Sequence, residues 1–125
     1  MAEETAEKKE SRLNRYFDRS LRMTQLGAYT IPRELIIPGP KRDEIVANMK
    51  IALGKVQRRA ERVFNLLSRE DEQTAVAFDI GQLHDHAKKM DENKSYLDLS
   101  FAFIALIGMS EGLKVFEEDL GIPET

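Results

Sequence analysis

The chain has 125 residues, no cysteine, no tryptophan and a formal net charge of −3, which is typical of one domain. The absence of cysteine excludes disulfide frameworks, thiolate metal sites and cysteine nucleophiles. The longest stretch without a charged residue, Leu99 to Ser110, has 12 residues, whereas a membrane helix needs about 20. Because no apolar signal segment is found at the N-terminus either, we expect a cytoplasmic protein.

The first part of the chain predicts one amphipathic helix. Residues 1–10 are mostly Glu, Lys, Ala and Thr, and we expect a disordered or frayed leader there, followed by a single helical domain over 11–125. The predicted helix presents one face at helical spacing, formed by Leu13, Phe17, Leu21 and Thr24. Gly27 fits the position just beyond its last turn.

Residues 27–40 predict a connector. Three prolines, Pro32, Pro38 and Pro40, forbid a continuous helix or a central strand. Apolar side chains at Ile31 and over 35–37 argue against a solvated linker. We therefore expect an extended segment that packs on the core, with a short pair of edge strands as the alternative.

Two further helices are predicted, from about Pro40 to Ser68 and from Ser68 to the break at 91–94. Proline suits a first helical turn, and Asp43 and Glu44 suit the positive end of the helix dipole. The expected core positions of the second helix are Ile45, Met49, Ala52, Val56, Val63 and Leu67. Those of the third helix are Val76, Ile80, Leu83, Ala87 and Met90.

The most apolar segment, Tyr96 to Leu120, predicts a fourth helix. It begins with a capping box at Ser95 and Asp98 and is followed by the stop signal Gly121. Alternating apolar residues leave a strand as the alternative for 96–107. Gly108 and Gly112 either allow close helix contact or mark a kink. The elements together predict an all-α fold, a four- to five-helix bundle with a Pro-rich extended connector between helices 1 and 2.

The charge is unevenly divided along the chain. Residues 1–69 hold 15 Lys plus Arg and 9 Asp plus Glu, a net of +6, whereas residues 70–125 hold 4 and 13, a net of −9. Such asymmetry points to nucleic-acid or partner binding. The acidic run 117–119 lies at the unfavourable end of its helix dipole. It is either a solvated last turn or a contact for a basic partner.

Two cationic stripes carry the main functional prediction. Their members have helical spacing and are Arg12, Arg15, Arg19 and Arg22 on the first helix, and Lys55, Arg58, Arg59 and Arg62 on the second. Guanidinium groups bind phosphate oxygens bidentately, so the stripes indicate binding of an RNA or DNA backbone without sequence preference. If the two helices are neighbours, the stripes could join into one surface.

Other interpretations of these stripes stay open. The basic half could dock on the acidic half within one molecule or in a second copy, or the arginines could simply form a solvated face. The sequence therefore predicts a non-enzymatic, nucleic-acid-backbone-binding small helical subunit of a nucleoprotein assembly, with other subunits or a second copy as protein partners. The alternative is a helical protein-interaction or self-assembly module that pairs its basic half with an acidic partner surface.

Catalytic and metal chemistry has little support in the sequence. The only histidines are His84 and His86, and Asp79, Gln82 and His86 share one helix flank. One histidine, one carboxylate and an amide make a poor metal site, so we expect the histidines to border the core. We expect no catalytic residue, metal, cofactor, small-molecule substrate or membrane partner.

The outline of the chain resembles that of one family. Its size, helicity, two arginine stripes and lack of catalytic motifs are similar to those of the small all-α subunits of CRISPR effector complexes. The resemblance implies an antiviral-defence subunit that binds neighbouring copies and holds nucleic acid through basic surface residues. Small archaeal or viral DNA-binding and assembly proteins fit the same outline. No family residue can be carried over.

Overall fold

The protein is all-α, as predicted. The structure, a computed structural model, describes residues 2–92 and 95–123. The elements are four α-helices and one 3-10 turn: α1 (Ala2–Ala28), η1 (Arg33–Leu35), α2 (Pro40–Leu66), α3 (Glu70–Glu92) and α4 (Tyr96–Leu120). Over this described part there is no strand and no fifth α-helix, so the strand alternatives for 96–107 and for the connector are wrong.

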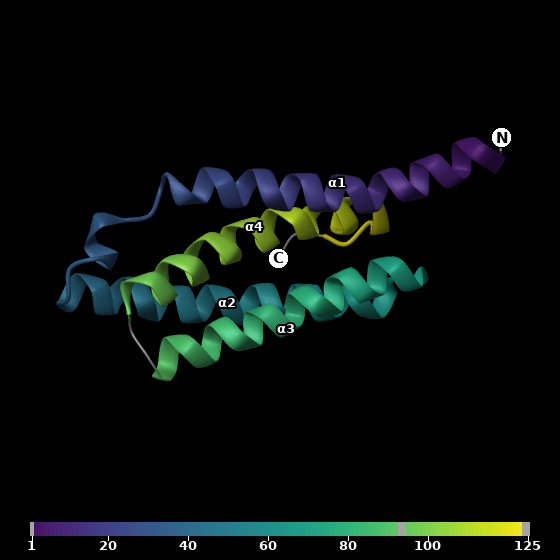
Figure 1. The fold of residues 1–125 in the computed structure, drawn as a ribbon. Helices are drawn as coiled ribbons and strands as arrows, with labels where there is room; N and C mark the ends of the chain where they lie inside the picture. The colour runs from purple at the N-terminus through teal and green to yellow at the C-terminus, as the bar shows by residue number, and fades with distance from the viewer. Residues whose placement is uncertain (1, 93–94, 124–125) are drawn as a thin grey trace.

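The helix α4 is the centre of the bundle. It packs against all three other α-helices, α2 and α3 also pack on each other, and α1 lies along α4 on the side away from the α2–α3 pair (Figure 1). By length and composition α4 could cross a membrane, but half of its apolar window is buried inside the bundle. Burial of this kind is what an all-round apolar helix requires in a core.

The predicted face of α3 is confirmed, and that of α2 in part. The buried residues include Met49, Val56 and Val63 on α2 and Val76 and Leu83 on α3, at the spacing that one helix face requires. On α2, Ile45 and Ala52 are only half-buried, whereas Val46, Leu53 and Ala60, which were not predicted as core, are buried.

The N-cap half of the capping box forms, because the Asp98 backbone N–H donates to Ser95 Oγ at 3.2 Å. The Asp98 carboxylate accepts from the Ser95 hydroxyl at 2.8 Å and not from the backbone. Gly121 ends α4 in the left-handed conformation, with φ of 69°.

The predicted core face of α1 is confirmed at Leu13, which packs on the core, and at Thr24, which faces Gly108, and it is wrong at Phe17 and Leu21. Tyr16 is fully buried, whereas Phe17 and Leu21 are 50% and 60% exposed. The Tyr16 ring packs 4.8 Å from the Phe116 ring, and the small side chains of Ser20 and Thr24 follow it along the interface. The two helix backbones come close there, which small residues allow and a row of large apolar residues does not.

The glycines of α4 explain this close approach. A Cβ atom at Gly108 would lie 2.1 Å from Thr24 Oγ1 and 2.9 Å from the Ser20 carbonyl oxygen. At Gly112 it would lie 3.1 Å from Ser20 Cβ. The pair therefore provides helix contact, which was one of the two interpretations of its spacing.

The end of α1 and the connector also differ from the prediction. Gly27 is buried within α1, where a Cβ would be 3.3 Å from Ile107 Cδ1, so it serves packing and does not end the helix. The connector is only partly extended, because residues 33–35 form η1 and bury Leu35 completely. Residues 2–10 continue α1 as helix, and the division of the chain into leader and domain stays a prediction.

Candidate functional site

The first arginine of the α1 stripe forms a buried ion pair. Arg12 Nε and Nη2 donate to the two carboxylate oxygens of Glu72 on α3, at 2.7 and 2.5 Å. Glu72 is fully buried, and the Arg12 guanidinium lies 5.5 Å from the centre of the Phe116 ring. The hydrogen bond to Glu72 raises the pKa of Arg12. Arg12 therefore holds α1 on α3. The Nε and Nη2 donors that would bind a phosphate bidentately are already bound to Glu72.

Two more arginines of this stripe reach carboxylates on α4. Arg15 pairs with Asp119 at 3.1 Å. Arg19 pairs with Glu111 at 3.1 Å and with Glu118 at 3.9 Å. A hydrogen bond from Lys114, assisted by Arg19, lowers the pKa of Glu111.

The α2 stripe contains one arginine of the same kind. Arg59 donates to Glu117 at 3.0 and 2.6 Å, and to the side chain and carbonyl oxygen of Ser110 at 2.9 Å each. The acidic run at the end of α4 is thus a contact for basic residues, and these belong to the same chain. Arginines from two helices offset the unfavourable placement of these carboxylates at a helix C-terminus.

The remaining four cations have no ion pair with the side chains that the structure describes, those of residues 12–92 and 95–123. They are Arg22 on α1 and Lys55, Arg58 and Arg62 on α2. The two stripes do not join into one cationic surface, because Arg15, Arg19 and Arg59 all end on α4 carboxylates. Positive charge without a carboxylate partner is concentrated along α2.

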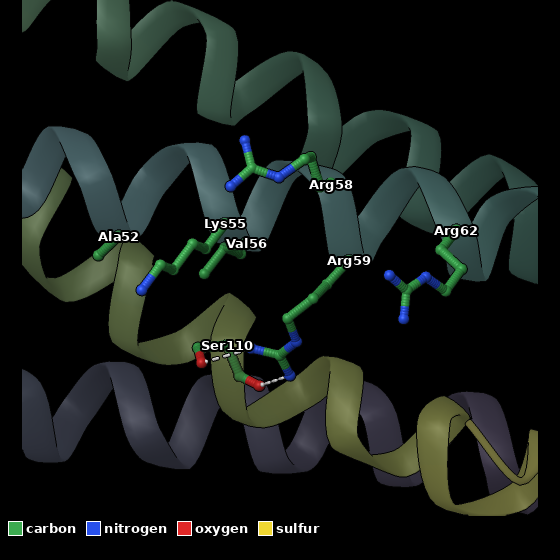
Figure 2. A pocket seen from close by; sticks show the side chains of 7 residues that line it. All are labelled: Ala52, Lys55, Val56, Arg58, Arg59, Arg62 and Ser110. Atoms are coloured by element: carbon green, nitrogen blue, oxygen red, sulfur yellow. Dashed lines mark hydrogen bonds between the residues drawn. The ribbon is translucent and has the colours of Figure 1, made fainter. Parts of the chain in front are cut away.

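A hollow of about 450 Å³ lies beside these α2 cations (Figure 2). It is lined by Ala52, Lys55, Val56, Arg58, Arg59, Arg62 and Ser110. Figure 2 shows the Lys55 and Arg62 side chains extending from α2 toward α4, with Arg59 between them bound to Ser110. The volume is within the range of small-ligand sites, about 300 to 1,000 Å³. The arrangement can hold an anion with several oxygens.

A second hollow adjoins the first. Its volume is about 240 Å³, and its lining residues are Met23, Ala52, Val56, Leu106, Ile107, Ser110 and Glu111. The two hollows share Ala52, Val56 and Ser110. They adjoin along α2 and α4, and only the second hollow also reaches α1, through Met23. We call the two adjoining hollows together the groove. We call the cation-lined part the basic hollow and the other part the apolar hollow.

The polar residues of α3 do not make a metal site. Tyr16 Oη donates a hydrogen bond to Asp79, and burial raises the pKa of both groups. His84 Nε2 lies 3.3 Å from Gln57 Nε2, and burial lowers the pKa of His86. Over the described residues, no three His, Asp or Glu side chains are grouped as metal ligands would be.

The burial of Asp79 leads to a prediction on pH dependence. Its ordinary pKa is 3.8, and the folded value is higher, so the folded state binds this proton more tightly than the unfolded chain. Stability from this group is therefore fully present below pH 3.8 and is lost as the pH rises through the folded pKa. Asp79→Asn removes the titration and keeps an oxygen that accepts from Tyr16.

We expect wild type to gain stability relative to Asp79→Asn as the pH falls from 7 toward 4. Urea unfolding at several pH values measures the difference between the two proteins. Asp18→Asn, at an exposed carboxylate of α1, is the matched control. A difference that stays constant over this range, or one that changes in the opposite direction, contradicts the prediction.

Docking of the basic half on the acidic half of the same molecule was one of the interpretations left open by the sequence, and the ion pairs of four arginines agree with it. Sequence reasoning did not identify the individual partners. Helical spacing predicts on which side of a helix Arg12, Arg15, Arg19 and Arg59 lie. It does not predict which carboxylates of other helices face them. Of those carboxylates, the run 117–119 was visible as a contact candidate, whereas Glu72 and Glu111 carried no distinguishing signal. Comparisons with protein-family models, with curated proteins and with solved structures found nothing that matches this chain.

Proposed function

We propose that this protein is a non-enzymatic, small helical subunit that binds a nucleic-acid backbone through α2. The observation that carries the proposal is the basic hollow, where Lys55, Arg58 and Arg62 surround about 450 Å³ without a carboxylate partner in the part of the chain that is described. A cationic site without its own anion is completed by an external one.

The spacing of these cations fits an extended anion. Lys55 and Arg62 are seven residues apart, which is about 10 Å along a helix axis. A single phosphate leaves part of that length unused, whereas successive phosphates of one strand contact several cations. None of the cations is fixed in an orientation that reads base edges, so the binding is expected to depend on salt and little on sequence.

The proposal revises the predicted set of contact residues. Lys55, Arg58 and Arg62 are assigned to phosphate contact, whereas Arg22, on α1, lines neither hollow and is not part of the proposed site. Arg12, Arg15, Arg19 and Arg59 are assigned to the ion pairs that hold the bundle together. A CRISPR effector complex is one candidate for the larger assembly, on the outline resemblance alone.

A charge reversal in the basic hollow tests the proposal. Lys55→Glu with Arg62→Glu is expected to weaken binding to RNA and DNA by at least about tenfold and to lower the slope of log affinity against log salt by about 2. Fluorescence polarisation with labelled 20-residue oligonucleotides, titrated from low to high salt, measures both quantities. The matched control is Lys88→Glu with Lys89→Glu, which makes the same charge change on exposed residues of α3.

Two results would reject the proposal. One is that wild type binds no polymer at low salt. The other is that both charge reversals weaken binding equally, because the effect then follows net charge and not the basic hollow.

The alternative of a protein-interaction or self-assembly module is favoured by a separate observation. Several large apolar side chains are exposed on α1, just after it and at the start of α4: Phe17, Leu21, Tyr29, Leu97 and Phe101. Large exposed apolar surface is typical of contact with another protein. Light scattering over a range of concentrations distinguishes a self-associating chain from a monomer.

A further inference from the structure

The groove combines two surfaces of different chemistry. Its basic hollow presents Lys55, Arg58 and Arg62, and its apolar hollow is walled by Met23 on α1 and by Ile107 on α4. Because Ala52, Val56 and Ser110 line both hollows, one ligand can occupy them together. Such a ligand has an anionic group directly attached to a flat or apolar group.

We propose that the groove takes single-stranded nucleic acid, with an unstacked base in the apolar hollow and its phosphate on the α2 cations. The inference rests on the proposed function and specifies the class of polymer. A nucleotide carries its phosphate and its base close together, as the adjoining hollows require. In a duplex the bases are paired and stacked, so that none can enter the apolar hollow unless it first leaves the stack.

The edge of the apolar hollow supplies hydrogen-bonding groups for a base. The Glu111 carboxylate lines this hollow and is fixed there by Arg19 at 3.1 Å and by Lys114 at 2.7 Å. A carboxylate accepts hydrogen bonds from the exocyclic amino groups of bases. Its remaining lone pairs therefore favour a base that carries an amino group.

A lipid-like anion is the competing occupant. A fatty acid also joins an anionic head to an apolar part, and its chain needs a long apolar channel. The apolar hollow holds about 240 Å³, which is below the usual range of small-ligand sites, about 300 to 1,000 Å³. The size therefore favours one base over an acyl chain.

The experiment compares a labelled 12-residue single strand with its duplex, by fluorescence polarisation on the full chain. Wild type is expected to bind the single strand at least about tenfold more tightly than the duplex. Ala52→Leu adds volume where the two hollows meet and leaves the charge unchanged, so it excludes the base while the exposed cations still reach a backbone. Single-strand affinity should therefore fall to the duplex level while duplex affinity stays constant. Ala47→Leu, at an exposed position of the same helix, should behave as wild type.

A second probe reports the base itself. An oligonucleotide with 2-aminopurine at its centre is expected to become more fluorescent on binding to wild type, because the base leaves its stacked neighbours. This increase should be absent in Ala52→Leu. If Ala52→Leu fails to fold by circular dichroism, Met23→Phe is used in its place, because it also adds volume to the apolar hollow without a change of charge, and the same losses are expected.

The outcomes separate this inference from the proposed function. If wild type binds the single strand and the duplex with equal affinity, and Lys55→Glu with Arg62→Glu loses both, the inference is overturned and the proposal of backbone binding is kept. Absence of binding to either polymer overturns both. Binding of oleate without binding of the single strand also overturns the inference and assigns the groove to an amphiphile.

Discussion

Arg12→Met is expected to lower the free energy of unfolding by about 3–5 kcal/mol, because it leaves the Glu72 carboxylate buried without its partner. Glu72 has no exposed surface, and Arg12 supplies both of its side-chain hydrogen bonds at 2.5 and 2.7 Å. Methionine has a similar length and no charge, so the change removes the ion pair with little loss of packing. Urea unfolding followed by circular dichroism at 222 nm measures the effect.

A second substitution separates the charge from the packing. Arg12→Met with Glu72→Leu leaves no buried charge, and we expect it to recover most of the lost stability. Arg15→Met is the matched control, since Arg15 and Asp119 are 52% and 35% exposed and such pairs contribute about 0–1 kcal/mol. A double variant as unstable as Arg12→Met would show that the arginine acts through packing, contrary to this argument.

The helices α2, α3 and α4 were predictable from the sequence because local signals agree with their packing. Val56 and Val63 on α2, and Val76 and Leu83 on α3, repeat at the spacing of one buried face. Ser95 and Gly121 mark the ends of α4 by mechanisms that depend on the neighbouring backbone alone. In these elements periodicity, capping and tertiary contacts lead to the same result.

The orientation of α1 was not predictable from periodicity, because its interface is made of small residues. Phe17 and Leu21 form the more hydrophobic face, yet they are exposed. The interface with α4 is formed by buried Tyr16 and by half-buried Ser20 and Thr24, of which only Thr24 was predicted, and it depends on the glycines of α4 that meet them. A hydrophobicity pattern records the residues of one helix and not the shape of the partner.

The sequence predicted which residues form the candidate site and only partly how they are arranged. Helical spacing placed Lys55, Arg58 and Arg62 on one side of α2, and the structure brings them around the basic hollow. Helical spacing could not distinguish these three residues from Arg59, which follows Arg58 directly in the sequence but is bound to Glu117. Ion pairs between distant residues depend on how the helices meet, and one sequence carries no direct signal of that.

Gly108→Ala is expected to lower the free energy of unfolding by about 1–3 kcal/mol, as overpacking does in a tight interface. Alanine normally favours a helix over glycine by about 1 kcal/mol, so the predicted sign is opposite to the helix propensity. The new methyl group would lie 2.1 Å from Thr24 Oγ1, a side-chain atom, and 2.9 Å from the Ser20 carbonyl oxygen. Since the second atom belongs to the backbone, α1 itself must move.

Two variants determine whether this contact is the cause. Gly81→Ala, on α3 with nothing within 4 Å of the added Cβ, should raise stability by about 0.5–1 kcal/mol. Gly108→Ala with Thr24→Ala removes the nearer clash and keeps the backbone contact, so it should recover only part of the loss. Thermal and urea unfolding measure all three proteins. If Gly108→Ala stabilised the protein as Gly81→Ala does, then the close approach of α1 and α4 could not be what orients Tyr16 and Arg12 toward α3.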